Sequence, residues 1–284
     1  MEEREKSNTP HPLQPIDLFS AVNNYFLLFF CASCVLSSIF IQQLFFLAGQ
    51  YRVGIGVSSI LGIIVPVYLL TRKFPPGFFG QIRLAKPRVH RLILVVVAAC
   101  AAVVLVDEIY VINQHFSPVP EDYADAIRDL KPDGPLEFVV TLLGLCLLVP
   151  VSEEIVFRGM IQRIFARNMG AVVGVALAGA IFGAVHLNVH LLISITVFGW
   201  FLGFLYQATG NLLYPIVAHA VFNGVALTQL VTDSSVEGGN LPVYLRDVWV
   251  VVAALVIIVF LIAKIKEGGS ESEPPSEGVD ASVG

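Results

Sequence analysis

The chain has 284 residues, of which 56% are hydrophobic and only 14% charged, and this composition excludes an ordinary soluble domain of the same size. The formal net charge is -5, and no stretch resembles the basic surface of a nucleic-acid-binding protein, so nucleic acid is not expected as a partner. The composition predicts an integral membrane protein, whose partners include the lipid bilayer itself.

Apolar runs recur along the chain. A helix needs roughly 20 residues to cross a hydrocarbon core of about 30 Å. Runs of this length predict an all-α, polytopic membrane helix bundle of about eight transmembrane helices over residues 21–266. The segment HLNVHLL is expected to form a tight turn between the fifth and sixth runs. The runs lie near residues 24–48, 53–71, 91–112, 136–157, 171–189, 190–208, 211–231 and 244–265.

The polar ends and loops predict the orientation of the bundle. Residues 1–20 and 267–284 are rich in Ser, Pro and Glu, and they predict a polar tail at the start and a disordered tail at the end. The loop after the second run is basic, whereas the loop after the third is mainly acidic. Because short basic loops stay in the cytoplasm, both tails are predicted to be cytoplasmic in a multi-pass protein of the cell membrane. The basic residues of the first loop are Arg72, Lys73, Arg83, Lys86, Arg88 and Arg91.

All four cysteines lie within apolar runs. Cys31 and Cys34 have C-x-x-C spacing, but redox or zinc chemistry needs thiolates in a polar setting and, for zinc, a second pair of ligands. The two residues are therefore predicted to be small apolar packing residues.

A few polar side chains stand out between Asn168 and Thr232, where the chain contains no Asp, Glu, Lys or Arg. Groups that ionise or hydrogen-bond strongly cost about 3 kcal/mol or more inside a bilayer unless they are paired or hydrated, so they often mark a site. His186, His219 and Asn223 are the candidates in this stretch.

The segment PVSEEIVFRG places three ionisable residues at the end of the fourth apolar run. Glu154 and Arg158 are four residues apart, so they share a helical face and can form an ion pair. Glu153 has no cation four residues on, where Phe157 stands, so its carboxylate is a candidate general base. The alternative is an ordinary charged helix end at the cytoplasmic interface.

Two further pairs have helical spacing. FGAVH places Phe182 one turn before His186, and HAVFN places His219 and Asn223 on one face, where an imidazole and a carboxamide can stabilise an oxyanion. For both segments the alternative is interhelical hydrogen bonding. HLNVH also gives His186 and His190 the spacing of a two-histidine zinc site, although a packing role is preferred for His190.

The three motifs EEIVFRG, FGAVH and HAVFN, in this order on separate apolar runs, resemble those of the type II CAAX prenyl endopeptidases and their bacterial relatives. This group, the CPBP or Abi family of intramembrane proteases, includes bacteriocin-processing and immunity proteins. The motif region, a CAAX-protease-like core, covers about residues 136–231, which is under half of the chain. The resemblance implies an eight-helix core whose site lies inside the bilayer and opens toward the cytoplasm.

The resemblance also implies an intramembrane endopeptidase that hydrolyses peptide bonds of membrane-associated or prenylated protein substrates. By this resemblance, Glu153 and His186 would activate water. Glu154 and Arg158 would order the site. His219 and Asn223 would bind the scissile carbonyl as it becomes an oxyanion.

Two mechanisms of water activation remain open. Glu153, His186 and His219 can supply the three protein ligands of a catalytic zinc ion, whose fourth ligand is water. The same groups can act without a metal if Glu153 polarises the water directly. Both mechanisms are compatible with the sequence.

Two other functions are alternatives. A non-proteolytic membrane scaffold or bacteriocin-immunity-type protein would keep the fold and bind partners, although it has no evident need for Glu153, His186 and Asn223 together. A transporter would use the Glu and His residues as a proton relay. The inverted repeats and paired broken helices usual in carriers are not evident in the sequence.

Depth in the membrane constrains the proposed site. If the fourth helix ended near residue 157, Glu153 would lie toward the inner face of the bilayer and His186 toward the outer face. The two residues meet if the helix continues through IVFRGMIQRIF to Ala166, tilted or kinked at Pro150. A continuous fourth helix is therefore predicted.

Overall fold

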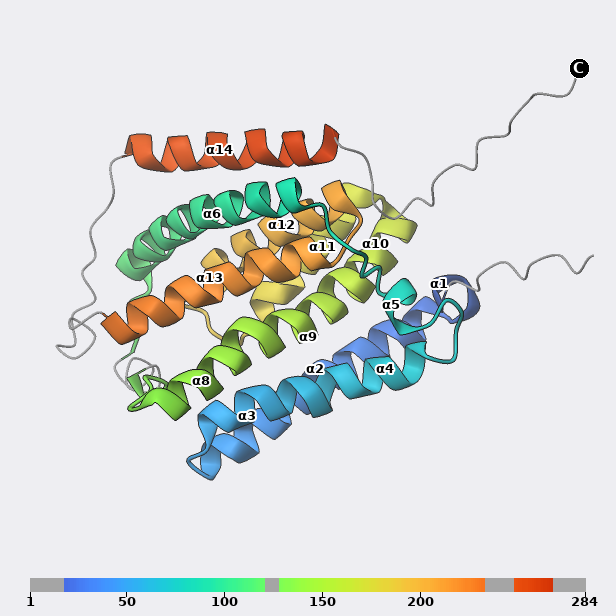
Figure 1. The fold of residues 1–284 in the computed structure, drawn as a ribbon, viewed down its shortest axis with the longest axis horizontal. Coiled ribbons are helices and arrows are strands. Elements are labelled where there is room, and N and C mark those ends of the chain that lie inside the picture. Colours follow the sequence, from blue (N-terminus) through green and yellow to red (C-terminus); the bar gives the residue numbers. More distant parts are fainter. Residues whose placement is uncertain (1–17, 121–127, 233–247, 268–284) are drawn as a thin grey trace, which may run out of the picture.

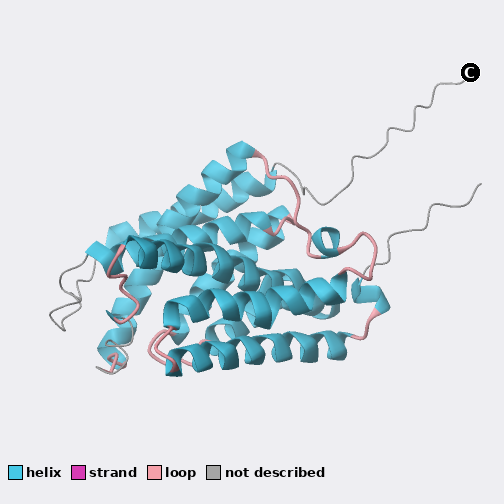
Figure 2. Ribbon diagram, turned by 60° about the horizontal axis from the view of Figure 1, so that its bottom comes forward, coloured by secondary structure: helices cyan, strands magenta, loops and turns pink. Residues whose placement is uncertain are grey.

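The computed structural model describes residues 18–120, 128–232 and 248–267. These residues form helices and loops without a β-strand, as the cyan ribbons of Figure 2 show. Figure 1 shows the long helices side by side in one bundle. The predicted all-α polytopic membrane bundle is therefore confirmed. The two predicted tails lie almost wholly outside the described residues.

Seven helices among the described residues are long and apolar enough to cross a membrane. Two of them contain π-helical segments, labelled η, whose turns hold more residues than an α-helical turn. The spans are α2 (Asn24–Leu47); α3 (Tyr51–Ser58), η1 (Ser59–Ile64) and α4 (Val65–Thr71); α6 (Val89–Phe116); α8 (Pro135–Leu143), η2 (Gly144–Leu148), α9 (Val149–Val156), η3 (Phe157–Ile161) and α10 (Gln162–Met169); α12 (Leu192–Thr209); α13 (Leu213–Thr232); and α14 (Val248–Glu267). The short helices are α1 (Leu18–Ala21), α5 (Phe78–Gln81) and α11 (Ala171–Ala184).

The fifth apolar run differs from its prediction. Its helix, α11, has 14 residues and a length of about 21 Å, too short to cross the membrane alone. The helix ends because Leu187 adopts a left-handed backbone conformation with φ of 52°, and the His190 amide then donates to the side chain of Asn188. HLNVHLL forms the expected turn. His186 thus follows the helix rather than lying on it, and the predicted helical face shared by His186 and His190 is wrong.

The fourth apolar run forms one continuous helix of 35 residues, Pro135–Met169. The predicted continuation to Ala166 is therefore confirmed, and the helix runs on to Met169. The π-helical turn η2 ends just before Pro150, whose missing N–H would interrupt a regular α-helical ladder. A wider turn at this point lets the helix run on through the bundle.

A hairpin at Gly170 brings two candidate residues to the same depth. Helix α11 packs back along α10. Glu153 lies 17 residues before Gly170, and His186 lies 16 residues after it. Both therefore lie roughly 25 Å from the turn, at about 1.5 Å per helical residue. Glu153 and His186 therefore do not lie toward opposite faces of the bilayer, because the helix that carries Glu153 is longer than its apolar run.

Gly174 is a point of close contact in this hairpin. A Cβ atom at position 174 would lie 2.7 Å from the backbone nitrogen of Ala166. Gly174→Ala is therefore expected to force α10 and α11 apart and to destabilise the protein by about 1–3 kcal/mol, the usual cost of overpacking. Chemical unfolding in detergent micelles measures this change.

Gly134→Ala is the matched control. A Cβ at Gly134 meets no atom within 4 Å, and the φ of Gly134, -159°, suits any residue. Its free energy of unfolding should stay close to that of the wild type. Equal unfolding free energies for the two variants would contradict the tight packing at Gly174.

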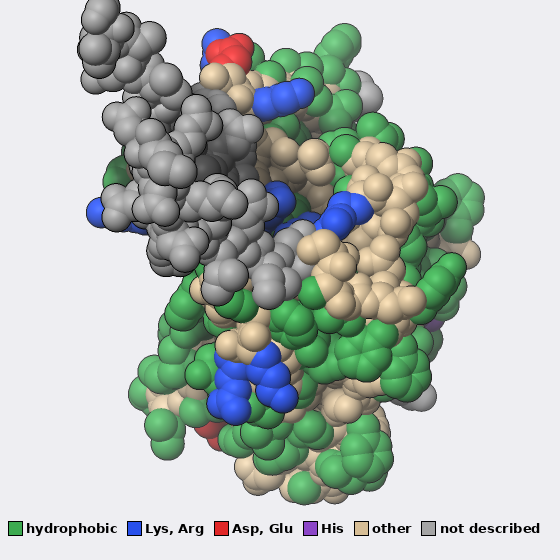
Figure 3. Space-filling model, turned by 90° about the vertical axis from the view of Figure 1, so that its right-hand side faces the viewer, with side chains coloured by type: hydrophobic (Ala, Val, Ile, Leu, Met, Phe, Trp, Pro, Cys, Tyr) green, Lys and Arg blue, Asp and Glu red, His purple; other side chains and the backbone are tan. Residues whose placement is uncertain are grey.

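One end of the bundle gathers basic residues, and Figure 3, which looks onto this end, shows Lys and Arg side chains at several places. The loop between α4 and α6 is tied here to the turn between α12 and α13. The Leu212 amide donates to the carbonyl of Arg83 at 3.0 Å, and Nδ2 of Asn211 donates to the carbonyl of Ala85 at 3.0 Å. These bonds fix the start of α13, the helix that carries His219.

The predicted packing role of Cys31 and Cys34 is confirmed. Both thiols are free and buried, and Sγ of Cys31 lies 3.8 Å from Sδ of Met160. They help to pack α2 against the 35-residue helix.

Candidate active site

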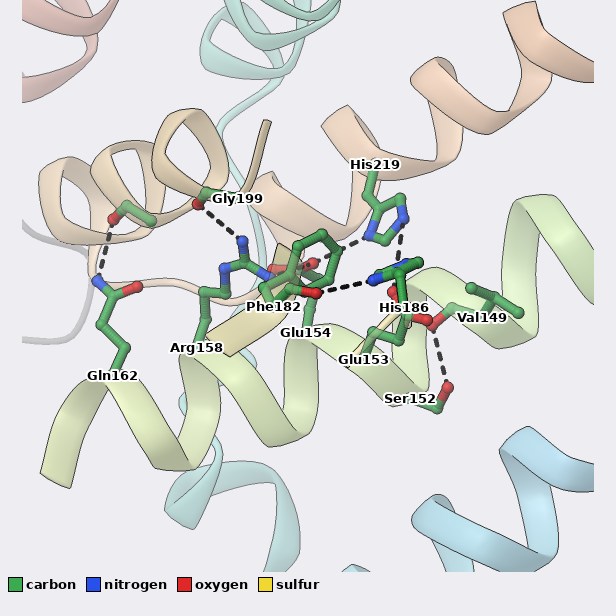
Figure 4. A network of polar contacts seen from close by, with 11 residues as sticks. Val149, Ser152, Glu153, Glu154, Arg158, Gln162, Phe182, His186, Gly199 and His219 are labelled. Atoms are coloured by element: carbon green, nitrogen blue, oxygen red, sulfur yellow. Dashed lines mark hydrogen bonds and ion pairs between the residues drawn. The ribbon is translucent and has the colours of Figure 1, made fainter. Parts of the chain in front are cut away.

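Helix α9 carries two adjacent glutamates inside the bundle (Figure 4). The side chain of Glu154 is fully buried, whereas that of Glu153 is 22% exposed. Neighbouring residues of a helix point about 100° apart, so the two carboxylates meet different surroundings. A carboxylate in an apolar bundle needs charged or hydrogen-bonding partners.

Arg158 is one partner of Glu154. Its Nη1 donates to Oε1 of Glu154 at 3.0 Å, and both side chains are fully buried, so the ion pair expected from their spacing is present. Nη2 donates to the carbonyl of Gly199 on α12 at 2.8 Å. The guanidinium carbon also lies 4.6 Å from the centroid of the Phe182 ring, in reach of a cation–π interaction. Arg158 thus neutralises Glu154 and joins its helix to α12.

His219 bridges the two glutamates. Its Nδ1 lies 3.0 Å from Oε1 of Glu154, and its Nε2 lies 3.8 Å from Oε2 of Glu153. Because an ionised carboxylate only accepts hydrogen bonds, Nδ1 carries a proton and donates it to Glu154. The ring meets Phe182 and Phe198 edge-on, with centroids 5.9 and 5.4 Å away. Glu154 therefore fixes the ring and directs Nε2 toward Glu153.

His186 approaches the site from the loop after α11. Its Nδ1 lies 2.7 Å from the carbonyl of Phe182, and since a carbonyl only accepts, this nitrogen carries the proton of the neutral ring. Its Nε2 is therefore a hydrogen-bond acceptor. The ring packs edge-on against Phe182 at 5.0 Å between centroids. His186, His219 and Arg158 thus all pack against the Phe182 ring. Despite this contact, His186 is exposed at the surface.

Asn223 lies one turn after His219 on α13 and reaches a different segment. Its Nδ2 donates to the carbonyl of Leu145 in η2 at 2.8 Å. This bond uses one of the two N–H groups of the amide. The two residues expected to act together as oxyanion donors therefore each hold a different part of the 35-residue helix.

All six candidate residues lie in a segment that matches one protein family. Residues 135–225 match the family described as type II CAAX prenyl endopeptidase Rce1-like. This part of the chain is Rce1-like. The match covers under half of the chain and includes EEIVFRG, FGAVH and HAVFN, the three motifs whose resemblance to this family the sequence indicated.

A curated bacterial protein is also similar to part of the chain. The uncharacterized protein YpbD of Bacillus subtilis (strain 168) is 32% identical over 89 residues, which are 31% of this chain and 45% of the relative. The similarity therefore spans less than half of that relative. No solved structure matches the chain.

The Rce1-like segment contains a second contact between helices that the sequence analysis missed. Gln162, one turn after Arg158, donates from Nε2 to the carbonyl of Gly203 at 3.0 Å. Gly203 lies one turn after Gly199, so two side chains from one helix reach two carbonyls of α12. Glycines leave these carbonyls uncovered and let helices approach closely. The spacing in GWFLG was the sequence signal for this contact.

Within the described part of the chain, no group of three or more His, Cys, Asp or Glu side chains is placed to hold a metal ion. Glu153, His186 and His219, the three ligands considered for zinc, do not form such a group. In this arrangement the residues therefore do not fit a three-ligand zinc site.

Proposed function

We propose that the protein is an intramembrane endopeptidase that hydrolyses peptide bonds of membrane-associated or prenylated protein substrates. The observation that carries the proposal is the position of His219 between the two glutamates. Its Nδ1 lies 3.0 Å from Oε1 of Glu154, and its Nε2 lies 3.8 Å from Oε2 of Glu153. Oε2 of Glu153 is buried and accepts no hydrogen bond. Such an atom is a natural acceptor for a water molecule.

The first step of the proposed reaction is attack by water on the scissile carbonyl carbon. Oε2 of Glu153 and Nε2 of His186 are both able to accept a hydrogen bond, so a water molecule between them would be held through its two O–H groups. Glu153 takes one proton as the water oxygen bonds to carbon, and His186 orients the water. A general base in this role contributes about 10²–10⁴-fold to the rate.

The second step is collapse of the tetrahedral intermediate. Its charged oxygen needs hydrogen-bond donors placed in advance. Asn223 keeps one N–H that Leu145 does not use, and His219 donates from Nε2 when its ring carries both protons. Glu153 then returns its proton to the leaving nitrogen as the C–N bond breaks. The products are a new carboxyl terminus and a new amino terminus.

The depth of the site supports substrates that enter the membrane. His219 lies nine residues after Gly210, at the turn between α12 and α13, which places it about 14 Å from that turn. We assign the basic end, where this turn lies, to the cytoplasm, because basic loops remain there. The scissile bond must then reach into the bilayer, carried by an apolar segment or by a lipid-modified chain end.

A comparison of protein termini tests the proposed function. Membranes of the source organism that carry either the wild type or Glu153→Gln, at equal protein levels, are analysed by mass spectrometry. We expect amino termini that occur only with the wild type, and these name the substrates. Identical profiles with a folded variant would favour the alternative of a non-proteolytic scaffold that binds partners.

A further inference from the structure

Basic residues gather in the loop between α4 and α6. Residues 72–91, which are this loop and the first residues of α6, contain six Lys or Arg residues and no Asp or Glu. Four of the six are exposed and form no ion pair within the described part of the chain. Basic residues next to the cytoplasmic end of a membrane-spanning helix attract anionic lipids. The four residues are Arg72, Lys73, Arg83 and Lys86.

Exposed apolar side chains place this loop at the membrane surface. Phe79, on the short helix α5, is 64% exposed, whereas Ile82 is only 2% exposed and belongs to the core. Val89, where α6 begins, is 72% exposed. Arg83 and Lys86 lie between these two exposed apolar residues in the sequence. Segments that combine aromatic residues with Lys and Arg lie at the boundary between lipid head groups and acyl chains.

The backbone of this loop is bonded to the start of α13. The carbonyl of Arg83 accepts a hydrogen bond from the amide of Leu212 at 3.0 Å. Ala85 makes two bonds with the side chain of Asn211: its amide donates to Oδ1 at 3.3 Å, and its carbonyl accepts from Nδ2 at 3.0 Å. The position of the loop and the start of the helix that carries His219 are therefore coupled.

The same loop is bonded to the helix that carries Glu153. The carbonyl of Gln81 accepts a hydrogen bond from Nη1 of Arg163 on α10. Ile82 packs near the backbone of η3, since a Cβ atom added at Gly159 would lie 3.9 Å from Cβ of Ile82. The loop therefore joins the 35-residue helix to α13, and the side chains of these two helices form most of the candidate active site.

We propose that the loop between α4 and α6 binds the head groups of anionic phospholipids through Arg83 and Lys86, and that bound lipid stabilises the contact between the loop and α13. Charge complementarity supports this partner, because the loop is basic and contains no acidic residue. Lys and Arg side chains lie beside hydrophobic ones on this end of the molecule (Figure 3). The forked guanidinium of Arg83 suits a phosphate, and Lys86 adds a compact positive charge. The inference goes beyond the proposed function, because it requires no proteolysis.

Native mass spectrometry of the full-length protein in neutral detergent micelles measures the binding. Phosphatidylglycerol, which is anionic, is compared with phosphatidylcholine, which has no net charge. We expect the wild type to bind phosphatidylglycerol more tightly. Lys86→Gln should weaken this binding about fivefold, the effect of one basic residue near an anionic surface. Lys266→Gln is the matched control, because it removes the same charge from an exposed lysine in the last turn of α14 and should leave the affinity unchanged.

Hydrogen exchange in lipid nanodiscs tests the effect on α13. The amide of Leu212, which donates to the loop, should exchange more slowly in phosphatidylglycerol than in phosphatidylcholine, because a more stable contact opens less often. This difference should shrink in Lys86→Gln and persist in Lys266→Gln. An exchange rate of Leu212 that is the same in both lipids would overturn the proposed stabilisation.

Three results of the binding experiment would overturn the lipid site. The first is equal affinity of the wild type for the two lipids, or an equal loss of affinity in Lys86→Gln and Lys266→Gln. The second is displacement of phosphatidylglycerol by inorganic phosphate, which would indicate a site for a free anion. The third is a preference for phosphatidylglycerol only after removal of residues 271–284, which contain four acidic residues and no basic one. The occupant of the loop would then be the protein's own acidic end.

Discussion

Glu153→Gln is expected to slow peptide-bond cleavage by about 10²–10⁴-fold, the contribution of a general base, while the protein stays folded. Glutamine keeps the shape of the side chain, but its amide cannot take a proton from water. The Glu153 side chain is partly exposed, and its Oε2 makes no hydrogen bond. The free energy of unfolding should therefore change by about 1 kcal/mol or less.

Single-turnover rates measure this effect, with full-length protein in proteoliposomes and a peptide that spans a cleavage site from the termini profile. Glu267→Gln is the control, since Glu267 is exposed and pairs with Lys264 at 2.9 Å, away from the site. It should cleave at the wild-type rate. A Glu153→Gln rate within tenfold of the wild type would remove Glu153 from the role of base.

Arg158→Met is expected to destabilise the protein by about 3–5 kcal/mol, the usual cost of leaving one member of a buried ion pair alone. Glu154 would keep a buried charge with His219 as its remaining partner, and the carbonyl of Gly199 would lose its donor. Chemical unfolding in mixed micelles gives the free energy. Arg72→Met, at an exposed arginine after α4, should change it by about 0.5 kcal/mol or less.

A double-mutant cycle separates the ion pair from simple loss of packing. Adding Glu154→Gln to Arg158→Met removes the stranded charge, so the double variant should be more stable than Arg158→Met alone. Coupling energies of about 0.5–3 kcal/mol are typical of such contacts. If the two substitutions added without coupling, the ion pair would not be what stabilises this part of the bundle.

Contacts within one helix could be predicted from the sequence, because the helical period fixes which residues share a face. The pair of Glu154 and Arg158 is of this kind. The contact of Phe182 with His186 was also expected from spacing, and it survives although the helix ends between them.

Contacts between helices could not be predicted in this way. His219 and Glu154 are 65 residues apart, and their meeting depends on how α13 packs against α9. The sequence grouped His219 with Asn223, which share a helical face. The structure gives the two residues different partners, and the carbonyl that Asn223 reaches belongs to a π-helical turn that no apolar pattern reveals.

A turn in HLNVHLL was expected, but the sequence did not show that α11 ends before His186. Leucine is a good helix former, so Leu187 itself gives no signal of a stop. The helix ends through a backbone conformation usually taken by glycine. That ending, with the longer fourth helix, sets the depth at which His186 meets the site.

Because the 35-residue helix contains two π-helical turns, η2 and η3, the arrangement of the site depends on the number of residues in these turns. A π-helical turn accommodates an extra residue, which rotates everything beyond it by about 100°. The turn η3 lies between Glu154, which faces His219, and Gln162, which binds Gly203. A one-residue deletion within η3 would restore α-helical winding and swing Gln162 away from its carbonyl while every contacting residue type remained. A relative with the same motif letters and one residue fewer would therefore hold a differently assembled site.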